Sequence, residues 1–484
     1  MNKAALKTFA TGARRQLMEQ VTVEAERLGM TVDHPITYST HGDYLTIGST
    51  PFPMAWRDAV ESLNQAWYRH GFAVLVEEVA YTWFNRFVAI RYMELHDYLP
   101  THIRVLSSRT PGQVDPDILL RYTDLPWPID VPRLEDAMRT GQRDQVFRHL
   151  LIEQCNQLHK IMPFLFEKLN DYTELLLPNH LLHTDSVISR LVRDLAEEDF
   201  QAVEVIGWLY QYYISEKNKQ IVGMNKGVVQ KEGLPAATQL FTPRWIVQYM
   251  VENSVGRAWK ASNPDSLVDK SWDYYLFREE KLSRASFEIE SIQILDPACG
   301  SGHILVYVFE LLFAMYEEMG YLESSIPSLI VKNNLFGLDI DARATQLATL
   351  ALMMKAREKD RKFFERDVAP NVLAFQDAAD IPDDIIQLVA HTPSEIHTLR
   401  ELLTYHKNAR QFGSLLEGYP IDTHRFFARI AALDENSGDM VDKASVLLLR
   451  SRLLAILRQN AMLQNTYDIV ITNPPYHNKY NPVL

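Results

Sequence analysis

The chain has 484 residues, 47% of them hydrophobic and 23% charged, which suits a soluble protein with the cores of two or three globular domains. Two cysteines, no apolar run of about 18 residues and no signal-peptide pattern argue against a disulfide framework and membrane contact, and predict a cytoplasmic location. The net charge of −13 gives no bulk attraction for nucleic acid, so DNA would need a local basic face. The histidines show no metal-ligand spacing, and no metal site is predicted.

Residues 1–235 are predicted to form a mainly helical N-terminal domain. Residues 78–99 carry an aromatic-rich apolar stripe at helical spacing, which predicts a helix that Pro100 terminates. The proline-rich stretch 110–132 predicts a connector or an extended surface segment, and helical patterns resume after it.

Residues 236–484 are predicted to form a second domain in which strands and helices alternate. Four short apolar strands are predicted, at 292–295, 334–340, 372–375 and 469–471. A helical insertion at 381–464 separates the third strand from the fourth. Such alternation predicts an α/β fold with a parallel, Rossmann-like sheet, whose ligands lie beyond the carboxyl ends of the strands.

A helix start precedes the first strand of this domain. In the run Phe241-Thr242-Pro243, Thr242 is predicted to be the N-cap and Pro243 the first helical residue.

The first strand leads into a glycine turn at residues 296–302, DPACGSG, and then into a helix. Gly300 and Gly302 would let the backbone approach a ligand closely, and the helix start offers free N–H groups. The turn could be a tight strand-helix connection or a dinucleotide site, but the third glycine of the dinucleotide fingerprint is missing. The negative charge of Asp296 would repel a pyrophosphate, but it suits the positively charged ammonium of an aminoacyl cofactor. This charge argument favours S-adenosylmethionine over NAD.

Two further acids follow predicted strands. Asp339 ends the second strand, where a carboxylate can accept both ribose hydroxyls of an adenosine. The alternative role, capping the next helix, fits Asp341 better. Asp377 follows the third strand and could reach the adenine amine of the cofactor, or it could be one of several surface acids in this stretch.

The tetrad Asn473-Pro474-Pro475-Tyr476 follows the fourth strand. The N6 amine of adenine is a poor nucleophile because its lone pair is delocalised into the ring. The Asn473 side-chain oxygen and the Pro474 carbonyl can accept the two N6 hydrogens and favour a more tetrahedral nitrogen. The prolines fix the turn, and Tyr476 offers a face for stacking a flipped base. A Pro-Pro turn that merely ends a strand would explain the prolines but not Asn473 and Tyr476. The tetrad therefore predicts methyl transfer to adenine in DNA, with Asn473, Pro474, Pro475 and Tyr476 as catalytic residues.

Several runs together resemble the PglX adenine methyltransferases of BREX phage-defence systems. These runs are residues 81–86, 89–95, 207–213, 241–243, 296–305, 412–415 and 473–476. The resemblance implies a class I methyltransferase sheet and N6 methylation of adenine that marks host DNA as self. It implies S-adenosylmethionine as cofactor, with double-stranded DNA carrying a flipped adenine and other phage-defence proteins as partners. By motif, the cofactor would be held by Thr242, Asp296, Ala298, Gly300, Gly302, Asp339, Ile340 and Asp377.

Members of this family continue past the tetrad with further strands and a target-recognition region, so the methyltransferase domain is expected to be truncated after its fourth strand. Two alternatives stay open. One is a methylase fused to restriction activity, and the other is a non-catalytic scaffold that binds DNA or a partner through a methylase fold.

Overall fold

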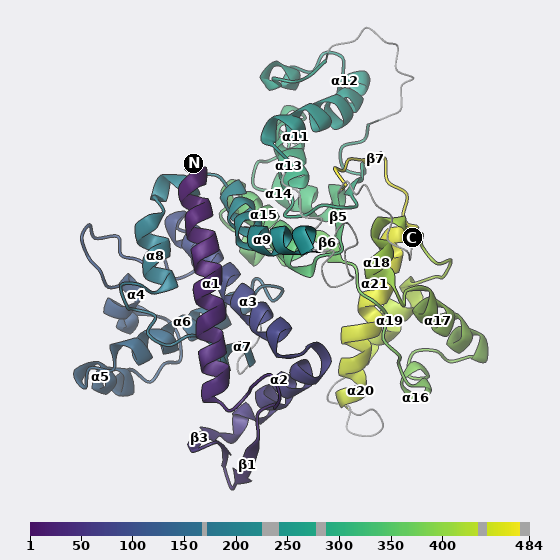
Figure 1. The fold of residues 1–484 in the computed structure, drawn as a ribbon. Coiled ribbons are helices and arrows are strands. Elements are labelled where there is room, and N and C mark those ends of the chain that lie inside the picture. Colours follow the sequence, from purple (N-terminus) through teal and green to yellow (C-terminus); the bar gives the residue numbers. More distant parts are fainter. Residues whose placement is uncertain (167–171, 225–241, 277–286, 434–442, 475–484) are drawn as a thin grey trace. The chain divides into compact units, whose positions relative to one another are not determined.

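A computed structural model describes residues 1–166, 172–224, 242–276, 287–433 and 443–474 (Figure 1). The chain divides into two compact units, Met1–Lys219 and Gln220–Leu484, called here the N-terminal and C-terminal units. The predicted boundary between residues 235 and 236 lies outside the described residues. Within the described ranges, no helix has the length and apolar character needed to span a membrane.

The N-terminal unit is mainly helical. Its helices are α1 (Lys3–Arg27), α2 (Arg57–His70), α3 (Phe72–Leu95), α4 (Asp117–Leu120), α5 (Val131–Arg139), α6 (Arg143–His159), α7 (Tyr172–Leu175), α8 (Val187–Asp194) and α9 (Glu204–Met224), which runs on past Lys219. The unit also contains a small antiparallel sheet that the sequence analysis missed, formed by β1 (Tyr38–His41), β2 (Tyr44–Ile47) and β3 (Thr50–Pro53). The stretch 110–132 is not wholly extended, because it includes α4 and the start of α5.

The predicted end of the aromatic-rich helix is wrong. Helix α3 ends at Leu95, well before Pro100. Asp97 adopts a φ of 58°, and the Tyr98 amide donates to the Met93 carbonyl at 2.8 Å. This pattern is a Schellman helix end, so a left-handed residue, and not the proline, terminates the helix.

The C-terminal unit is built on a four-stranded sheet in the order β6-β5-β4-β7, and every neighbouring pair is parallel. The strands are β4 (Ile294–Asp296), β5 (Leu335–Asp339), β6 (Asn371–Ala374) and β7 (Ile469–Val470). Each lies within two residues of its predicted position. The predicted α/β class with a parallel sheet is therefore confirmed.

Helices cover both faces of this sheet. Gly337 of β5 faces Leu305 of α13 (His303–Glu318), and α15 (Ala342–Lys359) contacts the same strand. On the opposite face, Leu338 of β5 belongs to an apolar cluster with Met462 and Leu463 near the end of α21 (Leu454–Gln464). Alternation along the strand sends successive side chains to these two layers.

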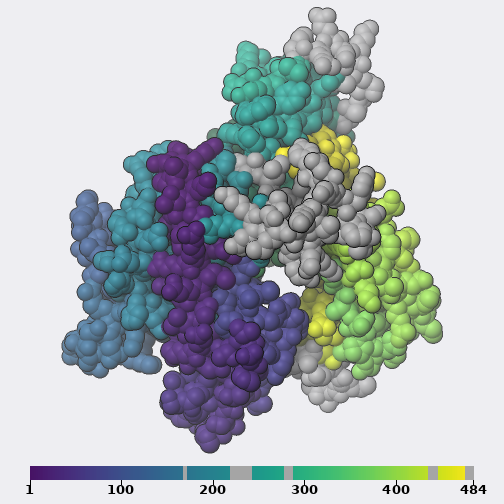
Figure 2. All heavy atoms as spheres, in the orientation of Figure 1, coloured from purple at the N-terminus to yellow at the C-terminus, as the bar shows by residue number. Residues whose placement is uncertain are grey.

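The segment between β6 and β7 forms a packed helical lobe, called here the insertion, which is drawn in green to yellow in Figure 2. Its helices are α16 (Asp383–Ile386), α17 (Pro393–Tyr405), α18 (Ala409–Phe412), α19 (His424–Ala432), α20 (Lys443–Leu448) and α21. It has its own apolar core, which includes Leu399, Phe426, Leu453 and Leu457, each no more than 1% exposed.

Candidate active site

Two segments far apart in the sequence meet at one edge of the sheet. Strands β4 and β7 are adjacent and parallel, with Leu295 opposite Val470. The ladder continues beyond β7, since the Ile471 amide donates to the Leu295 carbonyl at 2.9 Å. Because the two chains run in the same direction, the glycine turn after β4 and Asn473 after β7 emerge at the same edge. This edge, at the carboxyl ends of the strands, is called the rim below.

The glycine turn has a backbone that side chains would disrupt. Gly302 is the N-cap of α13 with a φ of 86°, and a Cβ there would lie 3.0 Å from the Cα of Ala348. Gly300 has a φ of 54°. Both conformations favour glycine, and Gly302 also lets α13 approach α15 closely. The turn is fixed to the neighbouring strand by the Cys299 amide, which donates to the Leu338 carbonyl at 2.9 Å.

Asp339 holds the glycine turn from the side. One carboxylate oxygen accepts the Gly300 amide and the other accepts the Asp341 amide, each at 2.8 Å. Asp341 is the N-cap of α15 and accepts the Arg343 amide at 3.0 Å. The helix-capping role therefore belongs to Asp341, as expected, and Asp339 faces the glycine turn at the end of β5.

Asp296 and Asp339 are buried carboxylates, 1% and 9% exposed. Burial raises the pKa of Asp296 to about 7, while the hydrogen bond from the Ala298 amide acts in the opposite direction. Burial likewise raises the pKa of Asp339 to about 6, against backbone hydrogen bonds that include the one from Gly300. Neither carboxylate forms an ion pair with a residue in the described ranges. A buried acid of this kind gains strongly from a bound cation.

Thr242 is not the predicted helix N-cap. Pro243, and not Thr242, is the N-cap of α11 (Arg244–Val251), and no side chain within the described ranges caps this helix. Instead, the Thr242 hydroxyl accepts a hydrogen bond from the Asn473 side-chain Nδ2 at 3.0 Å. The hydrogen-bond partner of this hydroxyl lies 231 residues away in sequence. Rules for helix capping consider only nearby residues, so they do not predict this contact. The contact points the amide nitrogen of Asn473 at Thr242 and thereby fixes the orientation of the amide.

The other predicted cofactor residues lie at the ends of β5 and β6. Asp377 follows β6, and one of its carboxylate oxygens accepts the backbone amide of Arg410 at 2.9 Å. Ile340 follows β5 and lies against Gly413. Arg410 and Gly413 belong to the insertion and were not predicted as site residues. The family resemblance at residues 412–415 was a sequence signal for Gly413, and none of the runs includes Arg410.

Asn473 and Pro474 are the two tetrad residues within the described ranges. Asn473 is half-buried and Pro474 is exposed. Pro475 and Tyr476 lie outside the described residues, so their roles stay predictions.

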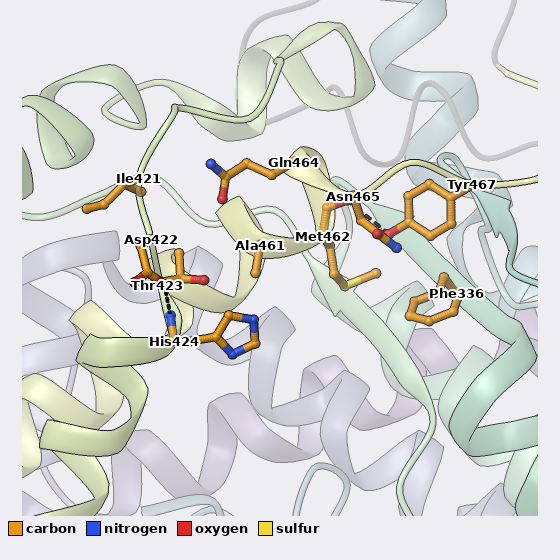
Figure 3. Close-up of a pocket in the computed structure, with 10 residues that line it drawn as sticks. All are labelled: Phe336, Ile421, Asp422, Thr423, His424, Ala461, Met462, Gln464, Asn465 and Tyr467. Atoms are coloured by element: carbon orange, nitrogen blue, oxygen red, sulfur yellow. Dashed lines mark hydrogen bonds between the residues drawn. The ribbon is translucent and has the colours of Figure 1, made fainter. Parts of the chain in front are cut away.

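A cavity of about 420 Å³ lies away from the rim (Figure 3). It is lined by Phe336, Ile421, Asp422, Thr423, His424, Ala461, Met462, Gln464, Asn465 and Tyr467. Phe336 stands near the amino end of β5, and Tyr467 precedes β7. The cavity therefore lies between the sheet and the insertion at the end opposite to the glycine turn, and it is separate from the candidate site.

The parallel sheet, the glycine turn and the Asn-Pro-Pro-Tyr tetrad define a domain of the DNA-methyltransferase class. Residues 273–385 match the family model described as MmeI, DNA-methyltransferase domain. Residues 333–482 match the model described as Eco57I restriction-modification methylase.

The chain is homologous, over 98% of its length, to two adenine-specific methyltransferases. It is 39% identical to BrxX of Escherichia coli O9:H4 (strain HS) and 34% identical to PglX of Lacticaseibacillus casei (strain Zhang). A shorter match, 25% identical over 31% of the chain and 14% of the relative, links it to a putative type II restriction enzyme and methyltransferase of Methanocaldococcus jannaschii. The chain spans about two-fifths of the length of the first two relatives, 42% and 43% respectively. The predicted resemblance to the PglX family is thus confirmed.

Proposed function

We propose that the chain carries the methylating machinery of a DNA adenine-N6 methyltransferase of a BREX-type defence system, with a Rossmann-like class I sheet as its catalytic domain. The observation that carries this proposal is the meeting of the glycine turn and Asn473 at the ends of the adjacent strands β4 and β7. A methyl donor on the turn and a base on the tetrad would then lie on neighbouring strands, which are about 5 Å apart in a sheet.

The residues at the rim fit S-adenosylmethionine. Gly300 carries no side chain and has open space where a Cβ would stand, so a cofactor could approach the backbone of the turn there. Asp296 is a buried acid suited to the ammonium of the methionine part. Asp339 would accept ribose hydroxyls, and Asp377 would accept the adenine amine. Ala298 and Ile340 would line the site beside them. When bound, the cofactor supplies the methyl group.

Asn473 is the residue that would activate the target amine. Its Nδ2 donates to Thr242, which orients the amide, and its side-chain oxygen is the acceptor that would take an N6 hydrogen of adenine. The Pro474 carbonyl would accept the second hydrogen, and Tyr476 would stack on the flipped base. Neither acceptor is a base, so the amine proton leaves only after the carbon-nitrogen bond has formed.

The substrate and the partners belong to the same proposal. The substrate would be double-stranded DNA with one adenine flipped out, and other phage-defence proteins would be partners. With a net charge of −13, the chain would bind DNA through local contacts, and its affinity would fall steeply with salt.

The direct test is transfer of a labelled methyl group from S-adenosylmethionine to duplex DNA by the full-length protein and by Asn473→Ala. Loss of one preorganised acceptor should lower kcat by about 100-fold or more. Asn465→Ala is a matched control, because Asn465 donates to Gln293 near the amino end of β4, away from the rim. Equal activity of wild type and Asn473→Ala, or transfer to DNA whose adenines already carry an N6-methyl group, would reject the proposal.

Thr242 provides a finer test of how Asn473 is oriented. Thr242→Val removes the hydroxyl with little change in volume, and we expect kcat to fall by about tenfold because the amide loses its fixed orientation. Thr242→Ser keeps a hydroxyl and should restore most of the rate. If Val and Ser variants lose the same activity, the hydrogen bond does not contribute to catalysis.

Two further assays distinguish the alternative functions, a restriction fusion and a non-catalytic scaffold. Magnesium-dependent cutting of DNA would favour a methylase-restriction fusion. Intact phage protection by Asn473→Ala without any methylation would favour a scaffold.

A further inference from the structure

The insertion holds three consecutive residues of the loop that follows β6. The Gln376 amide donates to the Gln459 side-chain oxygen at 2.7 Å. Asp377 accepts the Arg410 amide at 2.9 Å, and the Ala378 amide donates to the His406 carbonyl at 3.0 Å. These contacts come from α18, from the residue after α17 and from α21. The conformation of the Asp377 loop is therefore set by the insertion and not by the loop itself.

A second contact joins the insertion to the loop that follows β5. Gly413 has a φ of 53° and a ψ of −131°, a combination that only glycine adopts without strain. A Cβ on Gly413 would lie 3.1 Å from Cγ2 of Ile340, closer than ordinary packing allows. Segment 409–415 thus contacts both loops in which the adenosine-binding residues were predicted.

The insertion is fixed to this place by a buried chain of hydrogen bonds. The Gln459 side-chain nitrogen donates to Nδ1 of His406 at 2.9 Å, and Nε2 of His406 is 3.0 Å from the Asn460 side-chain oxygen. Asn460 also exchanges hydrogen bonds with the backbone of Tyr419, at 2.7 and 2.9 Å. His406 and Asn460 are fully buried, and Gln459 is 1% exposed.

The donor and acceptor of each hydrogen bond in this network follow from the two backbone amides at its ends, those of Gln376 and Tyr419. The Gln376 amide can only donate, so it fixes the oxygen of Gln459, and the Tyr419 amide fixes the oxygen of Asn460 in the same way. His406 must then accept at Nδ1 and donate from Nε2, which is the neutral form of the ring. Burial lowers the pKa of His406, in agreement with this form. A fully satisfied buried network of this kind specifies one geometry.

We propose that segment 409–415 of the insertion forms a wall of the cofactor site at its adenosine end, and that the His406-Gln459-Asn460 network positions this wall. This inference rests on the proposed function, since it assigns Asp377 and Ile340 to the same cofactor. The insertion is then part of the cofactor site and not an independent module on the sheet. Gly413 is the close-contact residue of the wall, while Gln459 acts only through its neighbours.

The test measures the binding of two probes to the whole chain, S-adenosylhomocysteine and 5′-methylthioadenosine, which lacks the amino acid part. Gly413→Ala should weaken both probes by about tenfold, because the backbone and Ile340 must shift. Gly320→Ala is the matched control: Gly320 has a φ of 84°, but nothing lies within 4 Å of its missing Cβ, and it follows the far end of α13. It should bind both probes like wild type.

A second variant covers the case in which Gly413→Ala does not fold. Gln459→Leu should weaken both probes by about threefold and raise the KM for S-adenosylmethionine, while kcat at saturating cofactor stays unchanged. Gln464→Leu, on the same helix, is its control.

The outcomes separate this inference from the proposed function. The proposal that segment 409–415 is a wall of the cofactor site would be rejected if both variants fold and bind the probes within about twofold of wild type. The two variants are Gly413→Ala and Gln459→Leu. A wild-type chain that binds neither probe would overturn the cofactor assignment itself. A loss for S-adenosylhomocysteine alone would place segment 409–415 at the methionine end and would also overturn the proposal.

Discussion

Buried carboxylates occur in both units of the chain, but their surroundings differ. In the N-terminal unit, Glu94 accepts hydrogen bonds from Arg91, Ser107 and the amides of Val105 and Leu106, at 2.7 to 2.8 Å. Its side chain is fully buried and paired with a buried cation. In the C-terminal unit, Asp296 and Asp339 are buried with backbone amide donors but without a cation in the described ranges.

This difference separates a structural acid from a binding acid. Glu94 links α3 to the following segment, and its charge is balanced within the fold, so nothing further is needed. Asp296 and Asp339 cost free energy when ionised, and their raised pKa values reflect that cost. A cationic ligand would remove it. The comparison predicts that the two kinds of acid respond oppositely to mutation.

The largest effect is expected at Glu94. Glu94→Ala leaves the buried Arg91 without its main partner and should lower the free energy of unfolding by about 3–5 kcal/mol. Chemical denaturation measures this loss. Glu61→Ala is the control, because Glu61 pairs with Arg57 in an exposed position and its removal should change stability little. A stability loss at Glu94 no larger than at Glu61 would contradict a structural role.

Asp296→Asn should act on ligand affinity and not on stability. Without the carboxylate, S-adenosylhomocysteine should lose about 2–5 kcal/mol of binding free energy, measured by calorimetry. The cofactor-free protein should be as stable as wild type or more stable at about pH 8, where an ionised Asp296 is unfavourable. Marked destabilisation with unchanged affinity would place Asp296 in the same class as Glu94.

A smaller effect is expected from pH. The folded pKa values of about 7 and about 6 exceed the ordinary value of 3.8, so the stability that these groups contribute in the cofactor-free protein is fully present below about pH 3.8 and is lost as pH rises from there to about 7. The melting temperature should therefore decrease over this range. S-adenosylhomocysteine needs the carboxylate, so its affinity should rise by up to about tenfold per pH unit as pH increases towards about 7 and then level off. In Asp296→Asn most of this dependence should disappear, and a flat wild-type profile would contradict the assignment.

Much of the fold could be predicted because its signals are local. Short apolar runs beside glycine or acidic residues predicted all four strands of the parallel sheet to within two residues. Asp341 was likewise expected as a helix cap. The end of α3 was predicted wrongly because a left-handed Asp97 ended the helix before the proline was reached. The small sheet β1-β2-β3 was missed because its strands are only four residues long and lie in a largely helical unit.

By itself, the sequence determined the α/β class, the glycine turn, the tetrad and the relationship to the PglX family. Each of these is indicated by short runs of neighbouring residues. Only the tertiary structure decided that Thr242 orients Asn473, that the insertion holds the Asp377 loop, and that Asp296 is buried with no cation among the described residues beside it. These features join residues tens to hundreds of positions apart. Which of them meet depends on the order and direction of the strands, and no local spacing records that arrangement.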